Sequence, residues 1–389
     1  MNLTVGMVEL LLLVAAVIAI AAKRLRIPYS VGLVVAGIAI SLWPRAAGIG
    51  LSHQLLFSVL LPPLVFEGAL DIHWQELKKD LSVILVLATL GVFLSACVTG
   101  VGMHYVARWE WSSAVLFSVL IAATDPVSVI ATFKEANKKG RLRLLIEAES
   151  LFNDGTAAAF FAIALAFVLD RAMRPLGMAR LVVATIGGGV LCGAIVALLL
   201  LLLAGRTDDH LVEITLTTLA AYGSFLLAEH FGFSGVLATL IAGLIVGNFG
   251  KRGVLSEKGR EAVASFWEYA AFVANSLVFL LMGLTGTRYN FLQLWPVALA
   301  GIALVLAGRA AATYLTLPLF SRSPARVSAR YQHVLFWGGM RGALALALAL
   351  SLPPEVPRRG EIVVVTFAVV AFSVFVQGLT ILPMLRRLD

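Results

Sequence analysis

The sequence predicts an all-α polytopic membrane protein with about 13 transmembrane helices, since apolar runs of roughly 17–25 residues, enough to cross a bilayer, recur along it. Of its 389 residues, 60% are hydrophobic and only 13% are charged, and the mean hydropathy is +0.95. The longest loops between these runs have about ten residues. We therefore expect a single membrane domain over residues 1–389, without a soluble domain or a low-complexity tail.

The apolar runs give the predicted helices in order, with ends that are less certain than their existence. The first run is followed by Lys23, Arg24 and Arg26 and has no basic residue before it. That order favours an uncleaved first helix over a secretory signal peptide. The predicted spans cover residues 5–22, 28–43, 54–71, 80–106, 111–133, 143–169, 181–204, 210–230, 233–249, 263–286, 292–319, 333–352 and 361–385.

The basic residues predict how the chain is oriented. Alternating loops place 20 of the 30 Lys and Arg residues on one face and 8 on the other, and Arg309 and Arg341 fall inside spans. By the positive-inside rule, the C-terminus is cytoplasmic and the N-terminus outside, in a cell (inner) membrane. Because the cytoplasmic loops explain the net charge of +8, we expect the lipid bilayer as a partner and no nucleic acid.

Cysteine usage gives no sign of a resident metal or cofactor. Cys97 and Cys192 both fall within apolar runs, where a thiol behaves as a small hydrophobic group. No disulfide framework or metal-ligand spacing is present in the sequence. We expect no cofactor, and the only metal to be a transported monovalent cation.

The sequence also predicts that the chain consists of two repeated halves, residues 1–170 and 210–389, joined by a linker helix at 181–204. The fifth span of each half is interrupted, at residues 124–126 and 338–342. Paired interruptions of this kind point to a transporter site near the middle of the membrane. An odd offset between the halves makes the two repeats inverted with respect to the membrane.

Local chemistry supports the first interruption. Asp125 is a favoured helix N-cap and Pro126 suits a first helical position, so the pair indicates the start of a second half-helix. The Thr124 carbonyl, freed by the unwinding, is then able to face a cation. A packed proline kink is the alternative. At the second interruption, Arg341 can offset the negative end of a half-helix.

Asp154 is the candidate carrier of charge, because it lies in the middle of a run long enough to span the membrane. An intramembrane carboxylate costs about 2.5–3.5 kcal/mol even on a lenient insertion scale and is normally retained for an ion or proton pathway. Ser150 precedes it by four residues and is its neighbour on a helix. Carboxylate and hydroxyl oxygens suit a hard cation, although Ser150 can equally bond back to its own helix.

Three segments carry a resemblance to a known family. They are Thr124-Asp125-Pro126-Val127-Ser128-Val129, Glu149-Ser150-Leu151-Phe152-Asn153-Asp154-Gly155 and Gly339-Met340-Arg341-Gly342-Ala343. In this order they resemble the signature segments of the cation:proton antiporter-1 family, which holds prokaryotic sodium/proton antiporters and eukaryotic sodium/hydrogen exchangers. The resemblance implies a homodimer in which a core domain, with crossed discontinuous helices, moves against a dimerisation domain.

The resemblance also implies roles for individual residues. Asp154, Ser150 and the Thr124 carbonyl would bind the transported cation, with Asp125 at the break beside them and Asn153 bracing the unwound segment. Glu67 matches an acidic position in the third helix of prokaryotic members, where it would guard the cytoplasmic entry or join the site through water. An interfacial, snorkelling Glu67 is the alternative.

Glu149 and Arg309 are predicted to neutralise each other, because either charge alone within the membrane is costly. The resemblance implies a fixed pair that serves structure and charge tuning, and titration of Glu149 during transport is the alternative. The remaining intramembrane acids, Glu213, Glu229 and Glu268, lie nearer span ends and are interpreted as interfacial.

The predicted function is secondary antiport of a monovalent cation for H+, with competition at Asp154. A buried carboxylate that holds either a proton or a cation, but not both, exchanges one for the other. Position 153 is Asn rather than a second Asp, so we expect one cation per proton. Na+ is the expected cation, with Li+ or K+ open. A cation channel and an intramembrane aspartyl hydrolase using Asp125 and Asp154 are less favoured.

Overall fold

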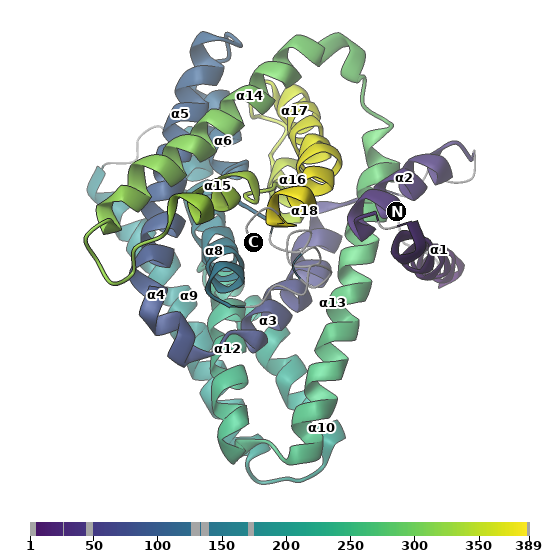
Figure 1. Cartoon of the computed structure of the whole chain (residues 1–389), viewed down its shortest axis with the longest axis vertical. Coiled ribbons are helices and arrows are strands. Elements are labelled where there is room, and N and C mark those ends of the chain that lie inside the picture. The colour runs from purple at the N-terminus through teal and green to yellow at the C-terminus, as the bar shows by residue number, and fades with distance from the viewer. Residues whose placement is uncertain are drawn as a thin grey trace.

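The computed structural model describes residues 5–25, 27–43, 50–125, 133, 140–169 and 175–386, and within these ranges the chain forms helices joined by turns (Figure 1). Several α-helices continue into a π-helical or 3₁₀ segment, labelled η. The elements up to Ala204 are α1 (Val5–Leu25), α2 (Tyr29–Ser41), η2 (Leu55–Leu60), α3 (Leu61–Asp71), α4 (Trp74–Val86), η3 (Leu87–Gly91), α5 (Val92–Tyr105), α6 (Trp111–Leu120), α8 (Arg141–Leu169) and α9 (Pro175–Ala204).

After α9 the chain continues as helices joined by turns, and α13 and α14 are the longest helices of this part. Its elements are α10 (His210–Thr218), η4 (Leu219–Gly223), α11 (Ser224–His230), α12 (Gly235–Phe249), η5 (Gly250–Val254), α13 (Glu257–Gly286), α14 (Phe291–Thr316), η6 (Leu317–Phe320), α15 (Ala329–Trp337), α16 (Ala343–Ser351), α17 (Arg359–Phe372), η7 (Ser373–Gln377) and α18 (Gly378–Arg386).

The polytopic helical fold is confirmed. In the described part of the chain, eight helices are long and apolar enough to cross a membrane, and α2, α6 and α12 are shorter apolar helices. Each predicted span contains at least one of the helices. The fourth span is longer than predicted, because α4, η3 and α5 form one helix from Trp74 to Tyr105. Its first turns are amphipathic rather than apolar, which is why the hydropathy pattern placed its start later.

Both predicted interruptions are present. Helix α6 ends at Leu120 and the chain is non-helical at Thr124 and Asp125, while α15 ends at Trp337 and α16 begins at Ala343. The half-helix expected to start at Pro126 lies outside the described residues.

Glycines bring the backbones of several helix pairs into direct contact. A Cβ on Gly37 of α2 would overlap the Leu280 carbonyl of α13, and one on Gly283 would overlap the Val34 carbonyl of α2. A Cβ on Gly193 of α9 would likewise overlap the Ala238 carbonyl of α12. Lipid supplies no hydrophobic force between helices, so close packing at small residues is what holds such pairs together.

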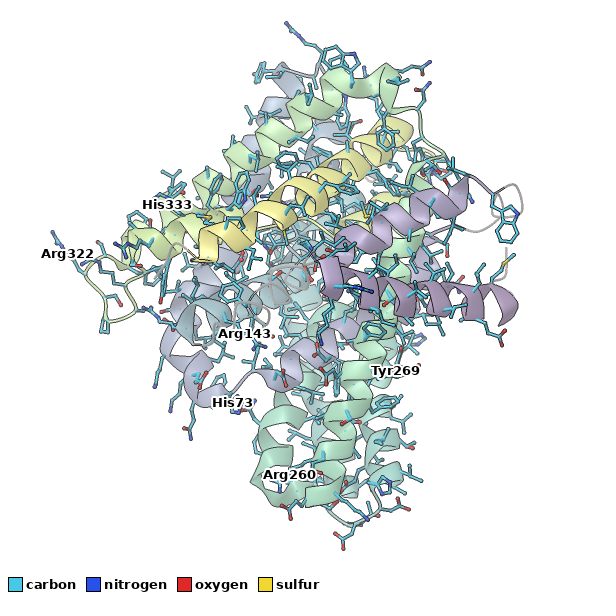
Figure 2. All side chains as sticks on the ribbon, turned by 45° about the vertical axis from the view of Figure 1, so that its right-hand side comes forward. His73, Arg143, Arg260, Tyr269, Arg322 and His333 are labelled. Atoms are coloured by element: carbon cyan, nitrogen blue, oxygen red, sulfur yellow. The ribbon has the colours of Figure 1, made fainter. Side chains whose placement is uncertain are left out.

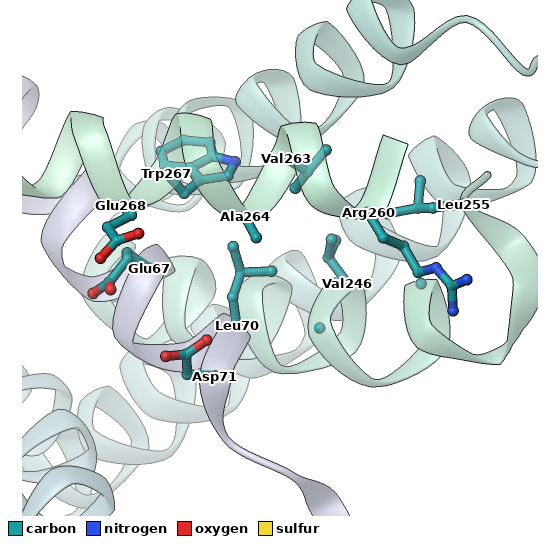
Figure 3. A pocket seen from close by; sticks show the side chains of 12 residues that line it. Glu67, Leu70, Asp71, Val246, Leu255, Arg260, Val263, Ala264, Trp267 and Glu268 are labelled. Carbon is teal, nitrogen blue, oxygen red and sulfur yellow. The ribbon is translucent and has the colours of Figure 1, made fainter. Parts of the chain in front are cut away.

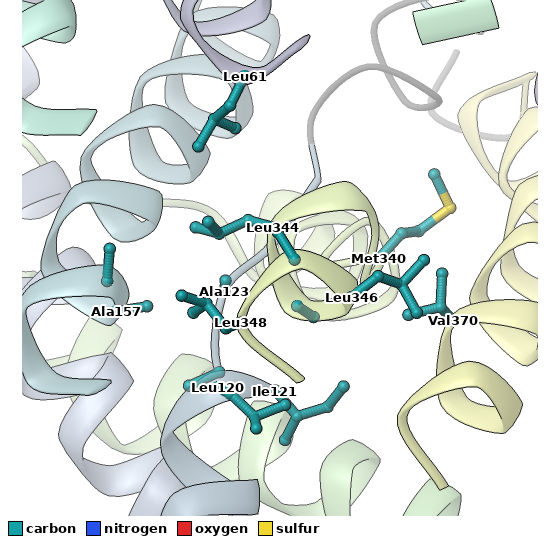
Figure 4. Packing of buried hydrophobic residues seen from close by; sticks show 14 of the residues in the cluster. Leu61, Leu120, Ile121, Ala123, Ala157, Met340, Leu344, Leu346, Leu348 and Val370 are labelled. Atoms are coloured by element: carbon teal, nitrogen blue, oxygen red, sulfur yellow. The ribbon is translucent and has the colours of Figure 1, made fainter. Parts of the chain in front are cut away.

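Apolar side chains fill the space around the broken helices (Figure 4). Leu120 and Ile121 from the end of α6 lie near Leu348 of α16, and all three are at most 3% exposed. Some charged side chains lie at the edge of the molecule instead, as Figure 2 shows for Arg322. The packing around the broken helices is an apolar environment in which a buried polar group needs a partner.

Two of the acidic residues interpreted as interfacial bind helix N-termini. Glu213 of α10 is 0% exposed and accepts hydrogen bonds from the Ser256 backbone N–H (2.8 Å) and hydroxyl (3.1 Å) at the start of α13. Glu229 of α11 accepts one from the Gly235 N–H (2.9 Å) at the start of α12. A carboxylate at a helix N-terminus is stabilised by the unpaired N–H groups and the helix dipole. Glu213 and Glu229 each bind the start of a helix that follows later in the chain.

The glycine contacts predict that two glycine-to-alanine substitutions differ in their effect on the stability of the protein. Gly283→Ala should destabilise the protein by about 1–3 kcal/mol, because its Cβ would press on the α2 backbone. Gly187→Ala in α9 is the matched control, since a Cβ there meets nothing within 4 Å and alanine favours helix. Thermal unfolding in detergent measures both, and equal melting temperatures for the two variants would contradict the prediction.

Candidate functional site

Helix α8 carries four of the predicted site residues one turn apart on a shared face. Glu149, Ser150, Asn153 and Asp154 are all buried, and Asp154 is the most accessible of them at 7%. Positions four apart on a helix are neighbours, so Glu149 lies beside Asn153 and Ser150 beside Asp154. Each of these two pairs thus presents one acid and one neutral polar group to the interior.

These residues hold the non-helical segment after α6. The Ser150 hydroxyl donates to the Thr124 carbonyl (2.5 Å) and accepts from the Thr124 hydroxyl (3.1 Å). The Asn153 amide donates to the Thr124 hydroxyl (3.1 Å). The structure therefore brings Thr124, Ser150 and Asn153 together, because α8 supplies the hydrogen-bond partners that the interrupted helix lacks.

The two interruptions cross and bond to each other. The Asp125 N–H donates to the Met340 carbonyl (2.7 Å). Arg341 donates from Nη1 to the carbonyls of Ala122 (2.5 Å) and Ala123 (3.1 Å), just past the C-terminal end of α6. A cation at the carboxyl end of a helix offsets the negative end of its dipole.

Asp125 lies near the N-terminal end of a helix, whereas Arg341 lies near a C-terminal end. It is so close to Gly342, the residue before α16, that a Cβ on this glycine would lie 2.5 Å from the Asp125 Cβ and Cγ. A carboxylate near a helix N-terminus is stabilised by the dipole. Each broken segment therefore supplies the charge that the end of the other segment's half-helix requires.

Glu149 and Arg309 form a buried ion pair. Arg309 donates from Nη1 to Oε1 (2.8 Å) and from Nη2 to Oε2 (3.0 Å), and the side chains are only 5% and 2% exposed. Arg309 also donates to the Leu335 carbonyl near the end of α15. The C-terminal ends of α6 and α15, which both run into an interruption, are thus each bound by an arginine. Sequence reasoning missed this second role of Arg309.

Asp154 differs from Glu149 in its partners. Its Oδ1 atom is buried and makes no hydrogen bond, and the same holds for Oδ1 of Asn153. Asp154 lines a small cavity of about 30 Å³ together with Thr124, Asp125 and the start of α16. A polar cavity of this size has room for a water molecule or a small ion. A carboxylate that lines such a space and has an unpartnered oxygen can bind a proton or a cation.

Helix α3 closes this cavity with apolar side chains. Leu61, Leu64 and Val65 are among the residues that line it. Sequence reasoning did not identify these residues, because an apolar residue in an apolar helix carries no mark of its neighbour. The pair Pro62-Pro63 in the same turn was the only local hint.

Glu67 lies apart from Asp154. It lines a different cavity of about 170 Å³ between α3, α12 and α13, together with Asp71, Arg260 and Glu268. Figure 3 shows the carboxylates of Glu67 and Glu268 side by side in this cavity. In this conformation the structure does not bring Glu67 to the lining of the Asp154 cavity.

Arg141 fixes the start of the site helix. It donates to both carboxylate oxygens of Asp80 on α4 (2.7–3.1 Å) and to the carbonyls of Ala325 and Arg326 in the loop before α15. Sequence reasoning counted Arg141 only as a cytoplasmic charge.

Among the residues that the structure describes, no group of three or more His, Cys, Asp or Glu side chains could hold a metal ion.

A free carboxylate at the crossing of two interrupted membrane helices defines the class of secondary transporters. The chain belongs to the family described as sodium/hydrogen exchanger, transmembrane, which it matches over residues 10–387. Among its relatives are the low-affinity Na+/H+ antiporter NhaS1 of Synechocystis (38% identical, covering 94% of this chain and 70% of the relative) and the Na+/H+ antiporter ApNhaP of Aphanothece halophytica (37% identical, covering 93% and 70%).

A solved structure shows the same fold. The sodium proton antiporter MjNhaP1 of Methanocaldococcus jannaschii, at pH 8, superposes with a TM-score of 0.78 and 20% identity, over 96% of this chain and 98% of that one. At this identity the likeness establishes the architecture alone.

The buried ion pair gives a stability prediction. Glu149→Gln or Arg309→Ala should each cost about 3–5 kcal/mol, because the remaining partner is left buried and unpaired. The double variant Glu149→Gln/Arg309→Met should recover part of this loss. Thermal unfolding of the purified variants measures the effect; single variants as stable as the wild type would show that the pair contributes nothing.

Proposed function

We propose that this protein exchanges a monovalent cation, Na+ in the first place, for H+ across the membrane, by competition at Asp154. The observation that carries the proposal is the unpartnered Asp154 carboxylate oxygen in the cavity at the helix crossing. Family membership and the Na+/H+ antiporters among the relatives support the same reading. K+ is the alternative cation, and a channel is the alternative class.

The charges around the cavity support a one-for-one exchange. Glu149 is neutralised by Arg309, and position 153 is a neutral amide. Asp125 and Arg341 offset opposite helix ends at the crossing. Asp154 is then the one carboxylate at the crossing whose charge changes, being neutralised either by a proton or by a cation. Because both loaded forms carry the same net charge, exchange is electroneutral.

The neighbouring oxygens supply the rest of the proposed cation site. The Thr124 carbonyl and the Ser150 hydroxyl lie within hydrogen-bond distance of each other, and rotation of the hydroxyl frees both oxygens toward the cavity. Oxygen ligands of this kind suit a hard monovalent cation. Asn153 positions Thr124 through its amide. Glu67 serves the cytoplasmic entry, and Glu149, Arg309 and Arg341 remain fixed charges.

The arrangement in the membrane completes the proposal. We infer a homodimer in the cell (inner) membrane, with the N-terminus outside and the C-terminus cytoplasmic. The domain comprises two inverted repeats, residues 1–170 and 210–389, joined by the linker helix at 181–204. The equivalent places of the two interruptions in the halves support this division.

The first test removes the carrier charge. Asp154→Asn should abolish cation-driven proton flux in proteoliposomes while the protein remains folded, because the substitution keeps the volume and removes the exchangeable group. Asp208→Asn, at an exposed position in the loop before α10, is the matched control and should retain flux. Normal flux in Asp154→Asn would disprove the mechanism, whereas a panel of Na+, Li+ and K+ gradients identifies the cation.

The pH dependence follows from competition. At low pH the resting carboxylate is protonated, so the apparent KM for the cation should rise by about tenfold for each unit fall in pH while the maximal rate is unchanged. At high pH the KM should become independent of pH. The rate should then be limited because too few carboxylates carry a proton on the return step. A KM that does not change with pH would show that the proton and the cation bind to different groups.

The membrane potential tests the stoichiometry. A charge that crosses the membrane is driven by about 2.3 kcal/mol per 100 mV. One-for-one exchange carries no net charge, so a potassium/valinomycin clamp should leave the wild-type flux unchanged. A flux that follows the clamped potential would show that a second charge moves with each cycle.

A further inference from the structure

Asp154 is enclosed in this conformation, and this constrains how a cation reaches it. The carboxylate is buried, and Leu61, Leu64 and Val65 of α3 line one side of its cavity. A cation arriving from the α3 side must pass these apolar side chains. Loading the site from that side therefore requires α3 and α8 to separate or to slide along each other.

Helix α3 is held firmly to α12. A Cβ on Gly243 of α12 would lie 2.7 Å from the Ala69 Cβ and 2.9 Å from the Phe66 carbonyl oxygen of α3. One turn further, a Cβ on Gly247 would overlap the Leu70 carbonyl. Backbones in such close contact leave no side chain that can yield. We therefore treat α3 and α12 as one body when α8 moves.

Helix α8 meets this body in a different way. At Gly155 the gap left by the missing side chain is filled by the Leu237 side chain of α12, whose Cγ would be 2.6 Å from a Cβ. At Gly68 of α3 the gap receives the Leu151 side chain of α8, at 3.2–3.3 Å. Both contacts are made by leucine side chains, which change rotamer, rather than by two backbones.

The residues one turn before and one turn after Gly155 on α8 favour movement of Leu237 in one direction along the helix. One helical turn toward the N-terminus lies Leu151, which is bulky and already rests on Gly68. One turn toward the C-terminus lies Ala159, which is small and buried. Packed helices move between discrete arrangements about one turn, or 5.4 Å, apart. Leu237 can therefore pass from Gly155 to Ala159, whereas Leu151 blocks the opposite shift.

We propose that Leu237 on Gly155 is the sliding contact of the transport step, so that Gly155 is a positioning residue that sets how fast the loaded site changes sides. The proposal rests on the exchange function proposed above and adds the contact that controls its rate. Gly155 contacts neither the proton nor the cation in this role. It provides the gap that Leu237 occupies in one state and leaves in the next.

The test is a paired substitution in proteoliposomes. Gly155→Ala should lower the maximal rate of exchange by about tenfold or more, because the added Cβ displaces Leu237. Adding Leu237→Ala should return the rate to within about threefold of the wild type, since the smaller side chain no longer meets the Cβ. Stabilisation of the purified protein by the cation should persist in both variants, because Asp154 is intact.

A second glycine gives the matched control. A Cβ on Gly301 of α14 would lie 2.6 Å from Val365 Cγ1 of α17, a similar clash away from α8. Gly301→Ala should lower the melting temperature, with recovery in Gly301→Ala/Val365→Ala, and leave the maximal rate within about twofold of the wild type. A rate loss equal to that of Gly155→Ala would overturn the proposal, because packing loss alone would then explain both.

A cross-link keeps the proposal testable if Gly155→Ala does not fold. In a protein with Cys97 and Cys192 replaced by serine, Ala159→Cys and Leu237→Cys should be joined by a short bifunctional thiol reagent during turnover and less at rest. Cross-linking that does not depend on the cation gradient would overturn the sliding contact, as would a Gly155→Ala rate equal to that of the wild type. A wild-type protein without exchange would instead disprove the proposed function.

Discussion

The crossing of the two interrupted helices is the constraint on which the rest of the structure depends. Interrupting a helix within a membrane leaves carbonyl and N–H groups without partners in a medium that offers none. Here the Asp125 N–H bonds to the Met340 carbonyl, and Arg341 binds the carbonyls that follow α6. Groups of the second interruption thus bind several of the N–H and carbonyl groups that the first interruption leaves without helical partners. This leaves a non-helical backbone next to α8, where its carbonyls can serve an ion.

The two core arginines bind other groups and leave Oδ1 of Asp154 without a hydrogen-bond partner. Arg309 is bound to Glu149 and to the end of α15, and Arg341 to the residues after α6. These bonds orient both guanidinium groups away from a direct hydrogen bond with Asp154. An acid in a strong ion pair would exchange a proton or cation poorly, because leaving the partner unpaired is costly. Of the acids on α8, Glu149 is held in a buried ion pair, whereas Oδ1 of Asp154 has no hydrogen-bond partner.

Glycine serves two purposes in the packing. Between α2 and α13, and between α3 and α12, it lets backbones touch and joins the helices rigidly. Between α8 and its neighbours it makes room for leucine side chains instead. Both uses look alike in the sequence, although one brings two backbones together and the other makes room for a side chain. The neighbour, rather than the glycine itself, decides which applies.

The sequence by itself determined the membrane-spanning class, the succession of helices and the positions of both interruptions, because hydropathy, proline and glycine act locally. It also singled out Asp154, since a lone carboxylate in an apolar run is costly wherever the run packs. Only the tertiary structure decided which groups meet. Arg309 binds the end of α15 as well as Glu149, Glu67 lines a cavity with Glu268 rather than the one with Asp154, and Leu61, Leu64 and Val65 line the Asp154 cavity. These contacts join residues far apart in the chain, and an apolar or paired side chain carries no local mark of its partner.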